Sequence, residues 1–301
     1  MRQRTLVREY KFEGKGLHTG RFAHVILCPA PAGTGVRFQR TDLSVADPFV
    51  EALAENVSST RRSTTLRKGK VKVQTVEHVL SALTGLGVDN ALIKIDSPEM
   101  PILDGSARLY VEAIAADPLQ EQDAERKWLT LSEPVVVEGG NGAYVRIEPA
   151  DDFRAEATID FGSKVLGVQT FGWDFSADYA SEVAPCRTFC FLHEIRKMLL
   201  FGLVKGGDLD NAIVVVEKPV SGRELSRMAK FFGQPKVEVS PDGYLCNAPL
   251  RFPDECCRHK MLDLLGDLRL AGGFFKARVT AFKPGHGLNT KAALALKSKL
   301  D

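Results

Sequence analysis

Two residues with the chemistry of metal ligands, His259 and Asp263, lie four positions apart in a segment whose apolar residues repeat at helical spacing. Residues four apart project from one face of a helix, one turn above the other. Asp267 continues that face by a further turn, and Lys260 flanks it. The spacing suits a pair of metal ligands. A solvent-exposed helix surface shows the same pattern, so the spacing alone leaves both interpretations open.

A second candidate pair is Glu77 and His78, at the start of another segment with helical apolar spacing. Adjacent residues on a helix point about 100° apart. His78 could therefore bind a metal ion while Glu77 reaches a water molecule on that ion. His286 is a third candidate, because it lies between two glycines after a predicted strand. We expect it in a tight loop, where it suits a positioned acid or electrophile.

Two histidines and one carboxylate that leave coordination positions open fit a catalytic zinc site with water as the fourth ligand. The same ligands fit a non-haem iron centre, so the ligand set does not name the metal. Hydrolysis needs a base beside the bound water and a donor for the developing oxyanion, and Glu77 and His286 can supply these roles. We therefore favour metal-assisted hydrolysis over iron oxygenation.

The segments that must position these residues alternate between strand-like and helical patterns. In the first half, strands are predicted at 5–12, 23–27, 36–39 and 90–96, with helices at 75–86 and 106–116. In the second half, strands are predicted at 128–130, 135–137, 143–148, 155–161, 211–217 and 275–281, with helices at 191–200, 254–270 and 289–296. Thr75 and Asp254 are the expected N-caps of the two long helices.

Both halves follow one order of elements, and their long helices place a histidine at a corresponding position, His78 in one and His259 in the other. We therefore expect an α+β protein with two similar domains that pack face to face and leave a cleft between them. The predicted boundary separates residues 1–126 from 127–301, and the acidic, polar stretch 117–127 is the expected linker.

Composition and charge exclude several classes of protein. The 40 Lys and Arg residues nearly balance 38 Asp and Glu residues, and a net charge of +2 is too small for a nucleic-acid binder. The charged N-terminus differs from a signal peptide, and no apolar stretch approaches the roughly 20 residues of a membrane span. We expect a cytoplasmic protein without stable membrane insertion. Six cysteines without C-x-x-C spacing predict reduced thiols, with Cys186 and Cys190 as packing residues.

The candidate residues belong to longer motifs. Six of these occur in order along the chain: GKGLHTG at 14–20, TVEH at 75–78, ILDGS at 102–106, RTF at 187–189, HKMLD at 259–263 and KPGHGLN at 283–289. Together they resemble the UDP-3-O-acyl-N-acetylglucosamine deacetylase (LpxC) family, the zinc amidases of lipid A biosynthesis in Gram-negative bacteria. The resemblance covers effectively the whole chain. It implies two β-α-α-β sandwich domains, each with a small insert, and an active site in the cleft between them.

The resemblance also implies a reaction. This is the Zn²⁺-dependent hydrolysis of the N-acetyl group of UDP-3-O-acyl-N-acetylglucosamine, which releases acetate and UDP-3-O-acyl-glucosamine in the committed step of lipopolysaccharide biosynthesis. One Zn²⁺ per chain is implied, with Fe²⁺ left open. The acyl chain needs an apolar passage, which we expect from the second insert, including 212–216. A non-catalytic nucleotide-sugar binding module and an iron oxygenase remain the alternatives.

Roles at the reacting centre follow from the matching motifs. The resemblance implies that the metal ligands are His78, His259 and Asp263. Glu77 would be the general base, and His286 the protonated group that faces the oxyanion and the leaving amine. Asp267 would hold His286 in orientation, and the Thr188 hydroxyl would donate to the oxyanion.

Substrate contacts are implied in the same way. Lys260 would meet the diphosphate, Phe189 would line the sugar region and Lys283 would reach the nucleotide. The uracil would be held by Asp160 and Phe161, and His18 would lie near the reacting centre. The segment 205–211 resembles versions of the enzyme that are fused to an acyl-carrier-protein dehydratase, so a fused full-length protein is a further expectation.

Overall fold

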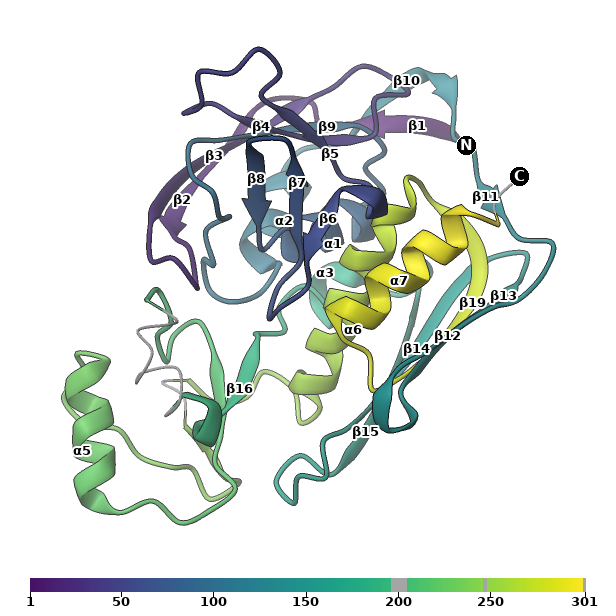
Figure 1. The fold of residues 1–301 in the computed structure, drawn as a ribbon. Coiled ribbons are helices and arrows are strands. Elements are labelled where there is room, and N and C mark those ends of the chain that lie inside the picture. Colours follow the sequence, from purple (N-terminus) through teal and green to yellow (C-terminus); the bar gives the residue numbers. More distant parts are fainter. Residues whose placement is uncertain (196–204, 246–247, 300–301) are drawn as a thin grey trace.

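The computed structural model describes residues 1–195, 205–245 and 248–299. It contains two main sheets with four helices between them (Figure 1). Each main sheet buries alternate side chains against these helices, as in β14, where Phe153, Ala155, Ala157 and Ile159 are buried. This period of two gives each sheet one apolar face that a helix layer can cover.

The first main sheet comes from the N-terminal half. Its strand order is β2 (Tyr10–Lys15), β3 (Phe22–Pro29), β9 (Ala91–Ile95), β4 (Val36–Arg40) and β5 (Phe49–Glu51). Strands β4 and β9 pair in parallel, and the other neighbours are antiparallel. The helices of this half are α1 (Glu77–Gly85) and α2 (Arg108–Ala115).

The second main sheet repeats this topology. Its strand order is β12 (Val135–Glu138), β13 (Tyr144–Pro149), β19 (Phe275–Phe282), β14 (Phe153–Asp160) and β15 (Val168–Asp174), and β11 (Leu129–Thr130) also pairs with β19. Again one pair, β14 and β19, is parallel while the rest of the path is antiparallel. The helices are α6 (Glu255–Leu268) and α7 (His286–Lys297). The expected α+β fold with two similar halves is therefore confirmed.

Each half carries an insert before its long helix. The first insert is an antiparallel three-stranded sheet of β6 (Val57–Ser59), β7 (Thr65–Lys68) and β8 (Val71–Gln74). The second contains β16 (Phe189–Phe191), β17 (Ile213–Val215), β18 (Tyr244–Leu245) and helix α5 (Gly222–Phe231). It projects from the rest of the chain at the lower left of Figure 1. Shorter helical elements are η1 (Ala54–Asn56), η2 (Gly140–Gly142), α3 (Tyr179–Glu182) and η3 (Arg269–Ala271).

The two long helices, α1 and α6, pack directly against each other. Nearly every side chain of α6 is buried, and so are residues 77–84 of α1. Contact is closest at Gly266, where an added Cβ would lie 2.1 Å from the carbonyl oxygen of Glu77. Glycine is therefore required on α6 at the level where α1 begins.

Three expectations for secondary structure are wrong. The supposed linker contains β10 (Gln120–Glu125), which pairs antiparallel with β1 (Arg2–Thr5) because the chain returns alongside its own N-terminal strand. The strand expected at 5–12 is two strands, β1 and β2, that belong to different sheets. His286 begins α7 instead of lying in a loop before it, since Gly285 is the N-cap.

Other expectations stay open or are only partly met. Residues 196–200 of the helix expected at 191–200 lie outside the described residues. The domain boundary between residues 126 and 127 stays a prediction. Asp254 occupies the N-cap position of α6, but its carboxylate accepts from Arg258 instead of from the helix backbone. Within the described ranges, no helix is both long enough and apolar enough to cross a membrane.

Candidate active site

The first turn of α1 supplies Glu77 and His78. Thr75 precedes it with a φ of 60°, so the chain turns sharply from β8 into the helix. The expected cap is therefore wrong: Val76 occupies the N-cap position, and no side chain caps this helix. The turn places both Glu77 and His78 in buried positions where α1 meets α6.

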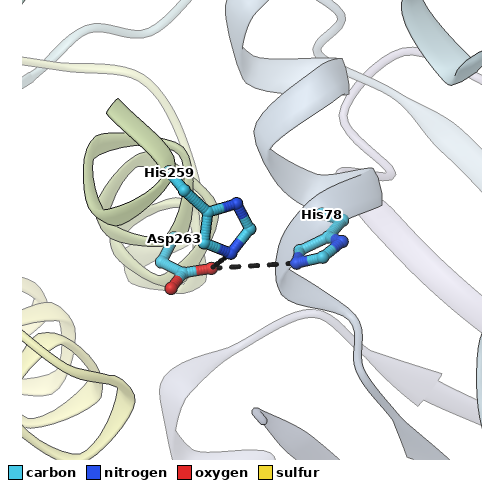
Figure 2. Close-up of side chains that lie close together, drawn as sticks. All are labelled: His78, His259 and Asp263. Atoms are coloured by element: carbon cyan, nitrogen blue, oxygen red, sulfur yellow. Dashed lines mark ion pairs between the residues drawn. The ribbon is translucent and has the colours of Figure 1, made fainter. Parts of the chain in front are cut away.

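Helix α6 brings His259 and Asp263 opposite His78. The Asp263 Oδ1 atom lies 3.4 Å from His259 Nε2 and 3.8 Å from His78 Nε2 (Figure 2). The ligand atoms of the three buried residues all lie within 4.8 Å of one another. The group contains His259 and Asp263, whose spacing left both a metal-ligand pair and a plain helix surface open, together with a histidine from the other half.

The donor set of this group fits a metal ion. Asp263 Oδ1 is buried, and no hydrogen-bond partner for it exists among the described residues. The Nδ1 atom of His259 lies 2.9 Å from the carbonyl oxygen of Cys186, which can only accept, so Nδ1 carries the hydrogen. The lone pair of His259 is thereby left on Nε2, facing Asp263 and His78. A buried, unpaired carboxylate oxygen beside two imidazole nitrogens is an arrangement that a cation would satisfy.

The electrostatics keep both imidazoles neutral and the carboxylate ionised. Burial, with the neighbouring His259, lowers the pKa of His78 to about 3, and burial likewise lowers the pKa of His259. Burial raises the pKa of Asp263, but Lys260 and the surrounding histidines outweigh it and hold that pKa well below its usual range. Neutral imidazoles and an anionic carboxylate are the protonation states that bind a divalent metal.

Glu77 and His286 face each other beside this group. His286 Nε2 lies 3.9 Å from Glu77 Oε1 and 4.0 Å from Asp263 Oδ2. On its other side, His286 Nδ1 donates to Asp267 Oδ2 at 3.0 Å. The structure thus brings together His286, Asp267 and Glu77, the three residues for which the resemblance implied the roles of acid, orienting carboxylate and base.

The pKa values of the facing pair are both raised. Burial raises the pKa of Glu77 to about 8, against the opposing charge of His286. Burial lowers the pKa of His286, but the carboxylates of Asp267, Asp263 and Glu77 outweigh it and raise that pKa to about 9. His286 is therefore a cation at neutral pH, and Glu77 titrates near neutrality, where a base is most effective.

These groups open into a pocket of about 230 Å³. Its polar lining includes the three candidate metal ligands, Glu77 and His286, together with Thr188, His18 and Lys260. The second insert supplies apolar lining to the same pocket. These residues are Leu209, Ala212, Val214, Phe231 and Phe232. The pocket thus joins a charged centre to an apolar passage that includes part of the expected segment 212–216.

The residues predicted to contact substrate form two groups. Lys260 lies inside the pocket, where its ammonium donates to Asp263 Oδ2 at 2.7 Å and approaches the Phe189 ring. Lys283, Asp160 and Phe161 do not line the pocket. Lys283 Nζ and Asp160 Oδ2 pair at 3.2 Å, and Phe161, which is 46% exposed, has its ring 5.6 Å from that of Phe189. The contact between the Phe161 and Phe189 rings therefore connects the group of Lys283, Asp160 and Phe161 to the pocket.

Sequence reasoning missed several residues that hold this site together. The fully buried Glu99 accepts hydrogen bonds from the backbone N–H groups of His18 and Thr19, at 2.8 and 2.7 Å. It thereby fixes the loop that brings His18 to the pocket, and no periodicity marks it as buried. Arg187 pairs with Glu255 at 2.9 Å and anchors the segment that presents Thr188. The only sequence signal for this role of Arg187 was its position in the RTF motif at 187–189.

A third missed residue is Thr64, which lies between β6 and β7. Its side chain is completely buried. Its hydroxyl donates to Asp267 and its backbone N–H to Glu77. Thr64 lies outside every motif that was singled out, so the sequence contained no signal for it.

Comparisons with known proteins show the family of the chain. The family model for UDP-3-O-acyl N-acetylglycosamine deacetylase (LpxC) matches residues 3–237 and 233–298. The bifunctional enzyme LpxC/FabZ of Porphyromonas gingivalis is 40% identical over 300 residues, which cover 99% of this chain and 65% of that protein.

Single-function relatives align over more of their own length. The UDP-3-O-acyl-N-acetylglucosamine deacetylase of Myxococcus xanthus is 41% identical over 292 residues, which cover 96% of this chain and 84% of the relative. The protein of the same name from Trichormus variabilis is 41% identical over 300 residues, with 97% of both chains covered. The chain therefore spans 65% of the length of the bifunctional relative, and 84% and 97% of the two single-function relatives. It belongs to the UDP-3-O-acyl N-acetylglycosamine deacetylase family.

Proposed function

We propose that this chain is a zinc-dependent deacetylase that hydrolyses the N-acetyl amide of UDP-3-O-acyl-N-acetylglucosamine. The products would be acetate and UDP-3-O-acyl-glucosamine, on the route to lipid A. The relatives that carry the deacetylase name support this substrate. The observation that carries the proposal is the buried group of His78, His259 and Asp263, with its unpaired carboxylate oxygen, beside the facing pair Glu77 and His286.

Zn²⁺ would be held by His78 Nε2, His259 Nε2 and Asp263 Oδ1. Two nitrogens and one oxygen leave a position open for water, as catalytic zinc sites require. When bound, the ion supplies a water molecule of lowered pKa and polarises the amide carbonyl. Fe²⁺ suits the same donors, so the physiological metal is part of what the experiment below must identify.

Glu77 would remove the proton from the attacking water. Its pKa of about 8 makes it a stronger base than an exposed carboxylate, it lines the pocket, and its Oε1 atom lies 3.9 Å from His286 Nε2. His286 would face the developing oxyanion as a cation and then donate its Nε2 proton to the leaving amine. Asp267 holds Nδ1, so Nε2 points toward Glu77 and the space where the amide must lie. The Thr188 hydroxyl would be a further donor to the oxyanion.

The substrate would extend in two directions from this centre. The acyl chain would occupy the apolar end of the pocket, which the second insert lines. The nucleotide would lie toward Lys283, Asp160 and Phe161, which adjoin the pocket through Phe189. Lys260 already pairs with Asp263, so its contact with the diphosphate would divide its charge between two anions.

An acetate-release assay on the purified chain tests the proposal. We expect acetate from UDP-3-O-acyl-N-acetylglucosamine, loss of that release after chelation, and recovery with one equivalent of Zn²⁺. Elemental analysis and an Fe²⁺ arm identify the metal, and His259→Ala is the matched control. Release that persists in the fully metal-free chain would exclude metal dependence. Binding without release would favour the nucleotide-sugar binding module, and strict dependence on oxygen would favour the oxygenase.

Fusion to a second enzyme is a separate proposal. It is supported by the relatives from Porphyromonas gingivalis and Bacteroides thetaiotaomicron, which are named bifunctional enzyme LpxC/FabZ and of which this chain spans 65%. The mass of the native protein, detected with an antibody to this chain, tests it. A native mass equal to 33.0 kDa would contradict a fusion.

A further inference from the structure

Thr64 joins two carboxylates of the site. Its backbone N–H donates to Glu77 Oε2 at 3.0 Å, and its hydroxyl donates to Asp267 Oδ1 at 2.5 Å. All three residues are buried, so water cannot replace either bond without a change in packing. The short distance to Asp267 is typical of a hydroxyl that donates to an ionised carboxylate.

Each carboxylate uses its other oxygen toward His286. Glu77 Oε1 faces His286 Nε2, while Asp267 Oδ2 accepts from His286 Nδ1 and from Asn289 Nδ2, both at 3.0 Å. Thr64 therefore binds one oxygen of each carboxylate, Glu77 Oε2 and Asp267 Oδ1. The other oxygen of each carboxylate faces a nitrogen of the His286 imidazole. Because both donors belong to one residue, the two carboxylates cannot move apart independently.

The bond to Asp267 also crosses between the halves. Thr64 belongs to the first insert, whereas Asp267 lies on α6, 203 positions along the chain. Glu77 is on α1 of the same half as Thr64. The hydroxyl of Thr64 thus aligns the base of one half with the acid system of the other.

We infer that Thr64 is a positioning residue for the proposed reaction. It holds Glu77 and Asp267 so that Glu77 Oε1 and His286 Nε2 point at the same reacting amide. It touches no substrate atom itself and acts through these two carboxylates. The inference rests on the proposed function in so far as Glu77 and His286 transfer protons.

A purely structural bond between the halves is the competing explanation, and the chain contains a matched control. Ser81 is also fully buried on α1, and its hydroxyl lies 2.7 Å from that of Tyr179, 98 positions away in the other half. This bond joins the same two halves without touching Glu77, Asp267 or His286. Ser81→Ala therefore removes a comparable bond and leaves the acid and base in place.

The kinetic test compares Thr64→Val, Thr64→Ser and Ser81→Ala. Valine keeps the shape and the backbone N–H and removes only the hydroxyl, whereas serine keeps the hydroxyl. Hydrogen-bond partners that orient the groups of an active site typically contribute about 10- to 100-fold to activity. We therefore expect Thr64→Val to lower kcat by roughly that factor at nearly unchanged KM. Thr64→Ser and Ser81→Ala should keep kcat and metal content. Wild-type kcat in Thr64→Val, or an equal loss in Ser81→Ala, would overturn the inference.

A second readout is independent of activity. In protein with ¹⁵N-labelled histidine, we expect Thr64→Val to shift the Nδ1 resonance of His286, with or without Zn²⁺, and Thr64→Ser and Ser81→Ala to leave it in place. An unmoved His286 resonance in Thr64→Val would contradict the positioning role. Thr64→Ala serves the same comparison where valine prevents folding. A wild-type chain that releases no acetate refutes the proposed function, while this comparison still tests Thr64.

Discussion

The two inserts leave their halves at corresponding places in the topology, after β5 in the first half and after β15 in the second, and in both before the long helix. They nevertheless build different parts of the site. The first insert contributes Leu66, Val71 and Val73 to the main core and holds the charged centre through Thr64. The second insert is divided: Ile213 and Val215 of β17 join the main core, while Val214 and Leu245 belong to a separate apolar cluster, and Val214 lines the pocket.

This difference has a physical consequence. Side chains that share the main core separate only when the whole fold opens, whereas the part of the second insert that packs only in the smaller cluster can open locally. The first insert therefore suits groups that need precise alignment, and the second suits a wall that must admit a long apolar chain. Changes near the first insert should lower kcat, and changes in the second should raise KM.

The largest effect is expected at the metal-binding group. His259→Ala and Asp263→Ala each remove one of the three proposed protein ligands, so we expect loss of bound metal and of acetate release. Metal analysis of the purified variants measures the first effect directly. One tightly held Zn²⁺ per chain in either variant would remove that residue from the ligand set.

Glu77→Gln should separate the base from the ligands. The amide keeps the size of the side chain and cannot accept the proton of water. We expect normal metal content and a kcat lowered by about 10²–10⁴, the usual contribution of a general base. Parallel metal analysis and acetate assays check this expectation. A variant that loses its metal together with its activity would instead place Glu77 among the groups that hold the ion.

The charge of His286 should affect stability in a defined pH range. Its pKa is raised from 6.5 to about 9, since Asp267, Asp263 and Glu77 outweigh the effect of burial. The folded state therefore binds this proton more tightly than the unfolded state. The contribution is fully present below about pH 6.5 and is lost as pH rises through about 9. Across that window it amounts to about 3 kcal/mol at most.

Denaturant unfolding of the metal-free wild type and of His286→Gln measures this contribution. We expect the wild type to lose its advantage over the variant as pH rises from 6 to 9.5. Taking the difference removes the contributions of titrating groups that do not interact with His286, whereas Glu77, whose pKa His286 lowers, remains part of the measured difference. A difference that stays constant with pH would show that His286 is not a buried cation.

The smallest effect is expected in the second insert. Phe232 lines the apolar end of the pocket, and Phe232→Ala removes its ring from the proposed acyl passage. Loss of part of a buried aromatic contact should raise KM for the acylated substrate by about tenfold and leave kcat nearly unchanged. Phe22→Ala removes an exposed ring on β3 that does not line the pocket, and it is the matched control. A fall in kcat in Phe232→Ala would erase the proposed distinction between the inserts.

Much of the site could be predicted from the sequence because the relevant signals are local. Residues four apart on a helix share a face, so the pairing of His259 and Asp263 followed from spacing alone. The repeated order of elements predicted two similar halves, and the corresponding positions of His78 and His259 on the long helices made the two histidines candidate partners. Both expectations are met by the observed sheets and by the distances at Asp263.

The tertiary structure alone decided which buried polar groups satisfy one another. Thr64 and Asp267 are 203 positions apart, and β10 pairs with β1 from the other end of the half, so no local pattern links either pair. Glu99 is an acidic residue whose partners are backbone N–H groups, which every sequence possesses. Periodicity reports which face of an element is buried. Hydrogen-bond partners depend on how distant segments meet, because a buried donor is satisfied by whatever acceptor packing brings to it.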